Sequence, residues 1–316
     1  MERRMRQGIR IIRKRMSGGR WTGVLALLCL LLSSWAEAGV PVISRQRVSD
    51  VTPRSFSVIF TVNEPSASIL SLFTADCATP FIGAASAIQQ NQVSGNTRIT
   101  ISGLNAATGY CYQLAVTSAS TSELTTSAAT QIATAVAIER TVAKGADIVP
   151  SGNDILKVPA VHLPSGETRD SIIATVELLD GTAVAPLSLL LGSTQNRDYF
   201  NLNNLFSSAT GKTYHLTGGE RIKVSENHGA TGCVIERFRT LPKASGGTAP
   251  RAFVQANAKD IDASGGVNIL DVLRVVGGKG TASTGPCFNS DLDLNGDGIV
   301  DSADLSIIKG GFNGLP

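Results

Sequence analysis

Asp260-Ile-Asp-Ala-Ser-Gly-Gly-Val-Asn-Ile-Leu-Asp271 and Asp293-Leu-Asn-Gly-Asp-Gly-Ile-Val-Asp-Ser-Ala-Asp304 are two copies of one pattern, placed 33 residues apart. In both copies oxygen-bearing side chains occupy positions 1, 3, 5, 9 and 12, with glycine at position 6 and valine at position 8. The glycine permits a sharp turn that directs successive oxygens inward. Because the spacing is repeated in register, we interpret the pattern as two copies of a cation-binding loop.

A calcium ion takes about 6–8 oxygen ligands, and a loop of this length wraps them around it. The predicted ligands are the side chains of Asp260, Asp262, Ser264, Asn268 and Asp271 with the carbonyl of Gly266, and the side chains of Asp293, Asn295, Asp297, Asp301 and Asp304 with the carbonyl of Ile299. We therefore predict two calcium sites. The second loop has four carboxylates and the first has three, so the second is expected to bind more tightly.

The similarity continues beyond the ligands. Asp271-Val-Leu-Arg-Val-Val-Gly-Gly278 aligns with Asp304-Leu-Ser-Ile-Ile-Lys-Gly-Gly311. Each copy is predicted to be a loop followed by a helix of about two turns, which ends at the glycine pair. Turn-forming residues such as Pro286 and Asn289 precede the second loop, so the entering helix of an ordinary EF-hand is not expected there.

With aspartate at position 12 and no entering helix, residues 257–316 resemble a dockerin module. The resemblance implies two calcium sites and attachment to a cohesin-like protein receptor. The chain departs from the family pattern at Ser264, which replaces the usual acidic or amide ligand, so the first site is expected to be the weaker one.

The resemblance also directs attention to positions 10 and 11, where dockerins commonly contact their partner. They are Ile269-Leu270 in the first copy and Ser302-Ala303 in the second. The apolar pair is either exposed for a partner or packed inside the module, and the sequence leaves both interpretations open.

The N-terminal segment has the three parts of a secretory signal peptide. Eight basic residues lie within residues 1–20, the apolar run Val24–Leu32 follows, and Ala36-Glu37-Ala38 forms a small-residue exit. The run is shorter than the roughly 20 apolar residues of a membrane span. We expect residues 1–38 to be removed and the chain to be secreted or displayed at the cell surface, with no membrane contact after cleavage. An uncleaved anchor is the alternative.

Removal of this segment reverses the net charge. It holds eight of the 28 basic and two of the 25 acidic residues, so 20 basic and 23 acidic residues remain, a net charge of −3. Because no basic stripe with interleaved aromatic residues remains, nucleic acid is not an expected partner.

Residues 39–134 alternate apolar and polar residues in short runs, which predicts a β-sandwich. The expected strands include Ser55–Val62, Ala67–Phe73, Arg98–Ser102 and Tyr110–Val116. Gly103-Leu-Asn-Ala-Ala-Thr-Gly-Tyr110 resembles a fibronectin type III pattern, with Leu104 and Tyr110 at the tyrosine-corner spacing. The tryptophan usual in that family is absent, and Phe60 is expected to fill its place.

Residues 138–241 match no family pattern. Strands are expected at Asp170–Leu179, Leu187–Leu191, Tyr214–Leu216 and Glu220–Val224, with a helical turn near Asn201–Ser207. Residues 242–256 contain Lys243-Ala-Ser-Gly-Gly-Thr-Ala-Pro250, which predicts a flexible linker that leaves the calcium module mobile. The predicted fold is thus mainly β, with a sandwich, a second β-rich domain and a small α-helical module.

Four cysteines follow the signal segment, and an even number in an exported chain favours disulfides. Three pairings are possible. Cys77–Cys111 within the sandwich and Cys233–Cys287 between the middle domain and the calcium module is the pairing that respects the domain boundaries.

The sequence shows no pattern of a catalytic site. The histidines at 162, 215 and 228 are isolated, and no nucleophile motif occurs. Scattered acids of the middle block offer carboxylates for glycoside hydrolysis, namely Glu177, Asp180, Asp198, Glu220 and Glu226. We expect a non-enzymatic adhesion or docking protein. One alternative is a carbohydrate-active protein of polysaccharide metabolism, whose middle domain binds or cleaves extracellular polysaccharide. Another is a calcium module that only stabilises its own chain.

Overall fold

The computed structural model describes residues 39–83, 87–136, 155–157, 163, 168, 171–180, 184–191, 199–207, 210, 214, 216, 218–241 and 257–312. The elements below all belong to one unit, residues 41–316. The expected signal peptide and the expected linker at 242–256 lie outside the described residues. Among the described helices, none has the length and apolar character needed to cross a membrane.

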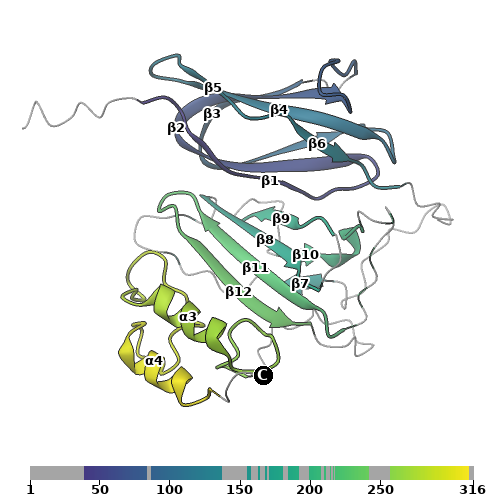
Figure 1. Cartoon of the computed structure of the whole chain (residues 1–316). Helices are drawn as coiled ribbons and strands as arrows, with labels where there is room; N and C mark the ends of the chain where they lie inside the picture. The colour runs from purple at the N-terminus through teal and green to yellow at the C-terminus, as the bar shows by residue number, and fades with distance from the viewer. Residues whose placement is uncertain are drawn as a thin grey trace, which may run out of the picture. The chain divides into compact units, whose positions relative to one another are not determined.

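The structure is mainly β and its sheets are antiparallel, as the sequence predicts. The first six strands form a sandwich: β1 (Ile43–Ser49), β2 (Ser55–Thr74), β3 (Ala87–Ser102), β4 (Gly109–Ser118), β5 (Leu124–Thr126) and β6 (Thr130–Ala133) (Figure 1). The first half of β2 pairs with β1 and the end of β3, and its second half pairs with β4 and the start of β3.

The two strands expected at Ser55–Val62 and Ala67–Phe73 are one continuous strand, so that prediction of a break was wrong. The pairing register of β2 shifts between Val62 and Ser68, where the strand passes from one layer to the other. Side chains from both layers fill the core between them. Phe60 is 1% exposed in this core, consistent with the expectation that it replaces a tryptophan.

Tyr110 adopts the tyrosine-corner geometry that its spacing predicts. Its ring is buried, and its hydroxyl oxygen accepts a hydrogen bond from the backbone N–H of Asn105 at 2.9 Å. The bond fixes the turn before β4 against the strand that follows it.

We expect Tyr110→Phe to lower the free energy of unfolding by about 1–3 kcal/mol, because the N–H of Asn105 loses its acceptor in a part-buried position. Tyr112→Phe is the control: within the described part of the chain its hydroxyl accepts from the Gln46 side chain at 3.2 Å, and that side chain can rotate to water. Urea unfolding of both variants measures the difference, and equal losses would contradict the assigned role of the Tyr110 hydroxyl.

The middle domain is built on a four-stranded sheet in the order β12-β11-β8-β9. These strands are β8 (Ile172–Leu178), β9 (Leu187–Leu190), β11 (Arg221–His228) and β12 (Val234–Thr240). A separate pair joins β7 (Ile155–Lys157) to β10 (Tyr199–Asn201), and a short 3-10 helix, η3 (Leu202–Asn204), lies at the expected helical turn. The strand expected at Tyr214–Leu216 includes a residue outside the described part of the chain.

The C-terminal module contains α3 (Ile269–Gly278) and α4 (Ser302–Lys309), which contact each other (Figure 1). Its small core includes the two valines of position 8, Val267 and Val300, with Val275 and Ile308 from the helices. The glycine pair after α4 follows the helix end as predicted, whereas Gly277 and Gly278 form the last residues of α3 itself. A Cβ on Gly278 would meet the end of the Leu292 side chain, which would have to shift to make room for it.

Both expected disulfides are present. Cys77 bonds to Cys111, and Cys233 bonds to Cys287. The second bond ties the segment before β12 to the segment between the two loops, so the module is not a freely mobile appendage, contrary to the prediction from the linker composition. Such bonds persist in oxidising compartments, which is consistent with an extracellular protein.

Candidate metal centre

Three buried carboxylates meet in the first loop. Asp260, Asp262 and Asp271 each place one carboxylate oxygen within 4.8 Å of the others. Asp271 is fully buried, and the other two are nearly so. Three negative charges this close are costly without a compensating cation, so the arrangement is that of a candidate metal site.

The backbone of each loop folds around its first aspartate. Asp260 accepts hydrogen bonds from the N–H groups of Ser264 and Gly265, both at 2.9 Å. In the second loop Asp293 accepts from the equivalent Asp297 at 3.2 Å and Gly298 at 2.8 Å. The glycine of position 6 has φ of +101° in the first loop and +87° in the second, so the predicted sharp turn is confirmed.

The residues at positions 9 and 12 of each loop also form the N-terminal cap of the helix that follows the loop. Asn268 is the N-cap of α3 and accepts from the Leu270 N–H, while Asp271 accepts from the Asn268 N–H at 2.8 Å. Asp301 and Asp304 form the same reciprocal capping box at the start of α4. Because the same side chains are the predicted metal ligands and the helix caps, metal binding and helix formation are expected to support each other.

The electrostatics of the first loop favour a cation. Burial raises the pKa of Asp260 above its ordinary value, and repulsion from Asp271 and Asp262 raises this pKa further. Backbone N–H groups of Gly265 and Ser264 act in the opposite direction but do not reverse the shift. A bound cation would favour the charged form of all three carboxylates.

The remaining predicted oxygens of the first loop lie beside this cluster. The hydroxyl of Ser264 lies 3.2 Å from the Gly266 carbonyl oxygen and 3.4 Å from an oxygen of Asp260, and the Asn268 amide lies 2.9 Å from the hydroxyl. Ser264 and Gly266 thus lie next to the three carboxylates, whereas Asn268 donates its NH2 group to the Ser264 hydroxyl and its side-chain oxygen caps α3. An all-oxygen donor set with three carboxylates fits a hard divalent cation.

The second loop is arranged less tightly around its acids. Among the described residues, only the first loop gathers three acidic side chains as a possible metal site. Position 3 is Asn295 here, and its amide donates to Asp297 at 2.8 Å. Asp304 is fully buried and accepts from the N–H groups of Leu294 and Asp301. The second site therefore stays a prediction from the repeated sequence pattern.

Positions 10 and 11 are exposed in both copies. Ile269 is 49% exposed and Leu270 is 54% exposed, so of the two interpretations of this apolar pair the core position is wrong. Ser302 and Ala303 are also exposed. The buried valines of position 8 instead supply the core of the module.

Sequence reasoning missed two arginines of the middle sheet that contact the loops. Arg221 of β11 donates to the carbonyl oxygen of Asp262 at 3.1 Å. Arg239 of β12 pairs with Asp291, two residues before the second loop. No local signal marks these contacts, because the partners are 41 and 52 residues apart in the chain.

The other residues considered for chemistry do not form one site. His162, His215 and Asp198 lie outside the described residues. Glu177 makes ion pairs with Arg47 and Lys223, both at 3.1 Å. His228 is buried 3.9 Å from Glu226, which also lies 3.6 Å from Arg237, and the sequence gives no indication of this buried charged group.

Comparison with known proteins assigns no family. No protein-family model matches the chain, and no curated protein matches it. Among solved structures, a myokine structure has 14% identity and a TM-score of 0.25, covering 30% of this chain and 98% of its own. The sensor domain of the anti-sigma factor RsgI4 in Pseudobacteroides cellulosolvens has 19% identity and a TM-score of 0.24, covering 32% and 100%. A segment of two fibronectin type III domains from chicken tenascin has 15% identity and a TM-score of 0.22, covering 63% and 98%.

Proposed function

We propose that this chain is an exported, non-enzymatic docking protein whose residues 257–316 bind two calcium ions and then attach it to a cohesin-like protein receptor. The observation that carries the proposal is the first loop, where Asp260, Asp262 and Asp271 converge beside the N-terminus of α3. Calcium is the cation whose preference for several carboxylate and carbonyl oxygens this donor set meets best.

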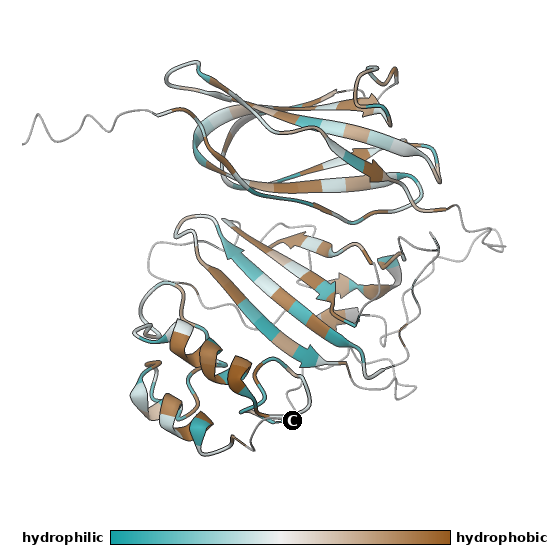
Figure 2. Ribbon diagram, in the orientation of Figure 1, coloured by the Kyte–Doolittle hydropathy of each residue, from teal (hydrophilic) through white to brown (hydrophobic). Residues whose placement is uncertain are grey.

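The exposed face of α3 supports a docking role. Four apolar side chains of α3 are each about half exposed, namely Ile269, Leu270, Leu273 and Val276. Ile269, Leu273 and Val276 are spaced by four and then three residues, which places them on one face of the helix. Figure 2 shows the apolar colouring along α3. In α4 the corresponding Ser302 and Ala303 are small, and Ser306 is also exposed. We therefore place the receptor contact on α3, beginning at positions 10 and 11 of the first loop.

In this proposal the two β domains are spacers or further binding faces. The sandwich, with its tyrosine corner, is proposed to be fibronectin type III-like. Such modules present a terminal domain at a distance from the point where the chain is held. The disulfide Cys233–Cys287 keeps the docking module joined to its carrier in an oxidising compartment.

The proposal is tested with the chain from residue 39 onward. Calorimetry is expected to show two calcium ions per chain, and immobilised cohesin domains are expected to retain the chain in calcium but not in chelator. A chain that binds no calcium would refute the proposal. Retention on insoluble polysaccharide with equal strength in calcium and chelator would instead favour a carbohydrate-binding role.

We expect Leu273→Ser to weaken receptor capture at least tenfold while leaving calcium binding unchanged, because the side chain is 55% exposed and lies outside the module core. Burial of one such side chain in an interface is worth about 1.5–3 kcal/mol. Leu124→Ser, at a 61% exposed position in the sandwich, is the matched control. Unchanged capture by Leu273→Ser would move the contact away from α3.

A further inference from the structure

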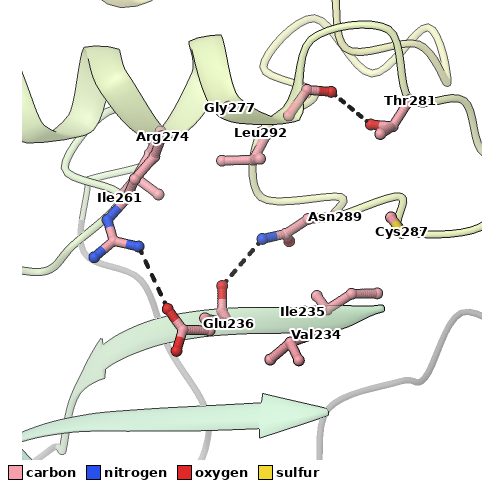
Figure 3. A pocket seen from close by; sticks show the side chains of 11 residues that line it. Val234, Ile235, Glu236, Ile261, Arg274, Gly277, Thr281, Cys287, Asn289 and Leu292 are labelled. Atoms are coloured by element: carbon pink, nitrogen blue, oxygen red, sulfur yellow. Dashed lines mark hydrogen bonds and ion pairs between the residues drawn. The ribbon is translucent and has the colours of Figure 1, made fainter. Parts of the chain in front are cut away.

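The calcium module is bonded to the edge strand β12 along the length of that strand. The disulfide Cys233–Cys287 lies just before the strand begins. Farther along, Asn289 donates to the carbonyl oxygen of Glu236 at 3.0 Å. Arg274 of α3 lies 3.8 Å above the ring of Phe238 and 3.9 Å from the Glu236 carboxylate. Figure 3 shows Arg274 and Asn289 both reaching Glu236 across a pocket of about 440 Å³.

The best-buried of these contacts is next to the second loop. Arg239 Nη2 donates to Asp291 Oδ1 at 2.8 Å, and Arg239 Nη1 lies 2.8 Å from Asp291 Oδ2. The two side chains are only 8% and 11% exposed. Asp291 precedes the first ligand position, Asp293, by two residues. The segment that enters the loop is thus held at Asn289 by a backbone oxygen of β12 and at Asp291 by a side chain of β12.

The first loop is contacted from the same sheet. Arg221 of β11 donates to the carbonyl oxygen of Asp262, which is the residue of position 3. Both loops therefore depend for part of their placement on arginines that lie outside residues 257–316. A change that loosens either contact would lower the fraction of chains in which the loop is arranged to bind metal.

We propose that Arg239 is a positioning residue for the second calcium loop and that β12 and the calcium module form one calcium-dependent unit. The inference rests on the proposed calcium binding. If the paired arrangement is the one that binds calcium, then breaking the pair lowers the fraction of chains ready to bind, and apparent affinity falls in proportion. By reciprocity, calcium strengthens the contact between the module and β12.

Two single substitutions separate positioning from simple charge effects. Arg239→Gln makes the region more negative, and Asp291→Asn makes it more positive. A long-range charge effect would therefore raise calcium affinity in the first variant and lower it in the second. Loss of positioning lowers affinity in both. We expect both variants of the chain from residue 39 onward to lose about tenfold or more in affinity at one site, measured by calorimetry.

A thermal readout distinguishes positioning from a general structural role. In calcium, both variants are expected to melt at a lower temperature than the unaltered chain. In chelator, the variants and the unaltered chain are expected to melt at the same temperature, because the contact is formed only when the module is folded. Circular dichroism at saturating calcium verifies folding. Arg239→Lys keeps the charge but not the planar fork, and is expected to fall between Arg239→Gln and the unaltered chain.

The ion pair between Arg98 and Asp50 provides the matched control. Its atoms are 3.0 Å apart, and Asp50 also accepts from Ser188 of β9, far along the sheet from β12. Arg98→Gln and Asp50→Asn should lower melting temperature equally in calcium and in chelator and leave calcium affinity within about twofold.

Unchanged affinity, or changes of opposite sign, in the Arg239 and Asp291 variants would overturn this inference alone if the unaltered chain binds calcium. Absence of calcium binding by the unaltered chain would overturn the proposed function together with it.

Discussion

Removal of calcium is expected to unfold α3 and α4 while leaving both β domains folded. Eight aspartates lie within residues 257–316, and Asp291 forms an ion pair with Arg239 of β12. The core of the module is small, so its apolar burial alone is a weak counterweight to the repulsion between the loop carboxylates. Metal binding then supplies the free energy that folds the segment.

The expected magnitude follows from mass action. At a calcium concentration about a thousandfold above the dissociation constant, each site stabilises the folded module by about 4 kcal/mol. Far-ultraviolet circular dichroism of the chain from residue 39 onward should lose the helical signal of α3 and α4 in chelator and keep its β signal. Excess calcium should restore the helical signal.

Magnesium is the informative control cation, since its smaller size and strict octahedral geometry make it a poorer fit to a loop of many carboxylates. Restoration by calcium but not by an equal concentration of magnesium would match the proposed site. An unchanged helical signal after chelation would show that the module folds by packing alone, with calcium playing no part in its stability.

The turns and helix starts of the two loops were predictable because their information is local. Each loop places its predicted ligands within twelve positions, and the turn glycines Gly265 and Gly298 and the N-caps Asn268 and Asp301 adopt conformations that their residue types favour. Strands β4, β8 and β9 were predictable for a similar reason, because alternation or short apolar runs between turns mark them directly.

The errors arose where distant parts of the chain decide the structure. Val62 and Ala67 belong to one strand because β3 pairs with both halves of β2, although Asn63-Glu-Pro65 has the composition of a turn. Strand β12 was missed because Arg237 and Arg239 share the inward face of the sheet with Ile235, which disrupts the expected alternation. The attachment of the module to this strand depends on pairs such as Arg239–Asp291, which no local pattern encodes.

Asp304→Ala is expected to reduce calcium affinity more than Asp271→Ala. Both aspartates occupy position 12 and are fully buried, so either substitution removes a predicted ligand from the loop. The second loop offers four carboxylates against three, and more negative charge generally tightens calcium binding. In calorimetry Asp304→Ala should therefore abolish the tighter of two binding steps, and Asp271→Ala the weaker one.

The structure adds two reasons for the same order. Asp304 accepts from three backbone N–H groups, those of Leu294, Asn295 and Asp301, whereas Asp271 accepts from two, those of Asp262 and Asn268. A buried N–H that loses its acceptor costs about 1–3 kcal/mol, and a part-buried one costs less. Position 4 also has positive φ in both loops, and it is Ala263 in the first loop but Gly296 in the second. The alanine strains the first loop, while glycine adopts this conformation readily.

Asn variants of both positions separate the two contributions. Asp304→Asn and Asp271→Asn retain an oxygen for the capping bonds but remove the charge, so each should lose less affinity than the corresponding Ala variant. The convergence of Asp260, Asp262 and Asp271 favours the opposite order, because a cluster already assembled requires less rearrangement on binding. Two equal sites, or a larger loss for Asp271→Ala, would show that this preorganisation outweighs the extra carboxylate of the second loop.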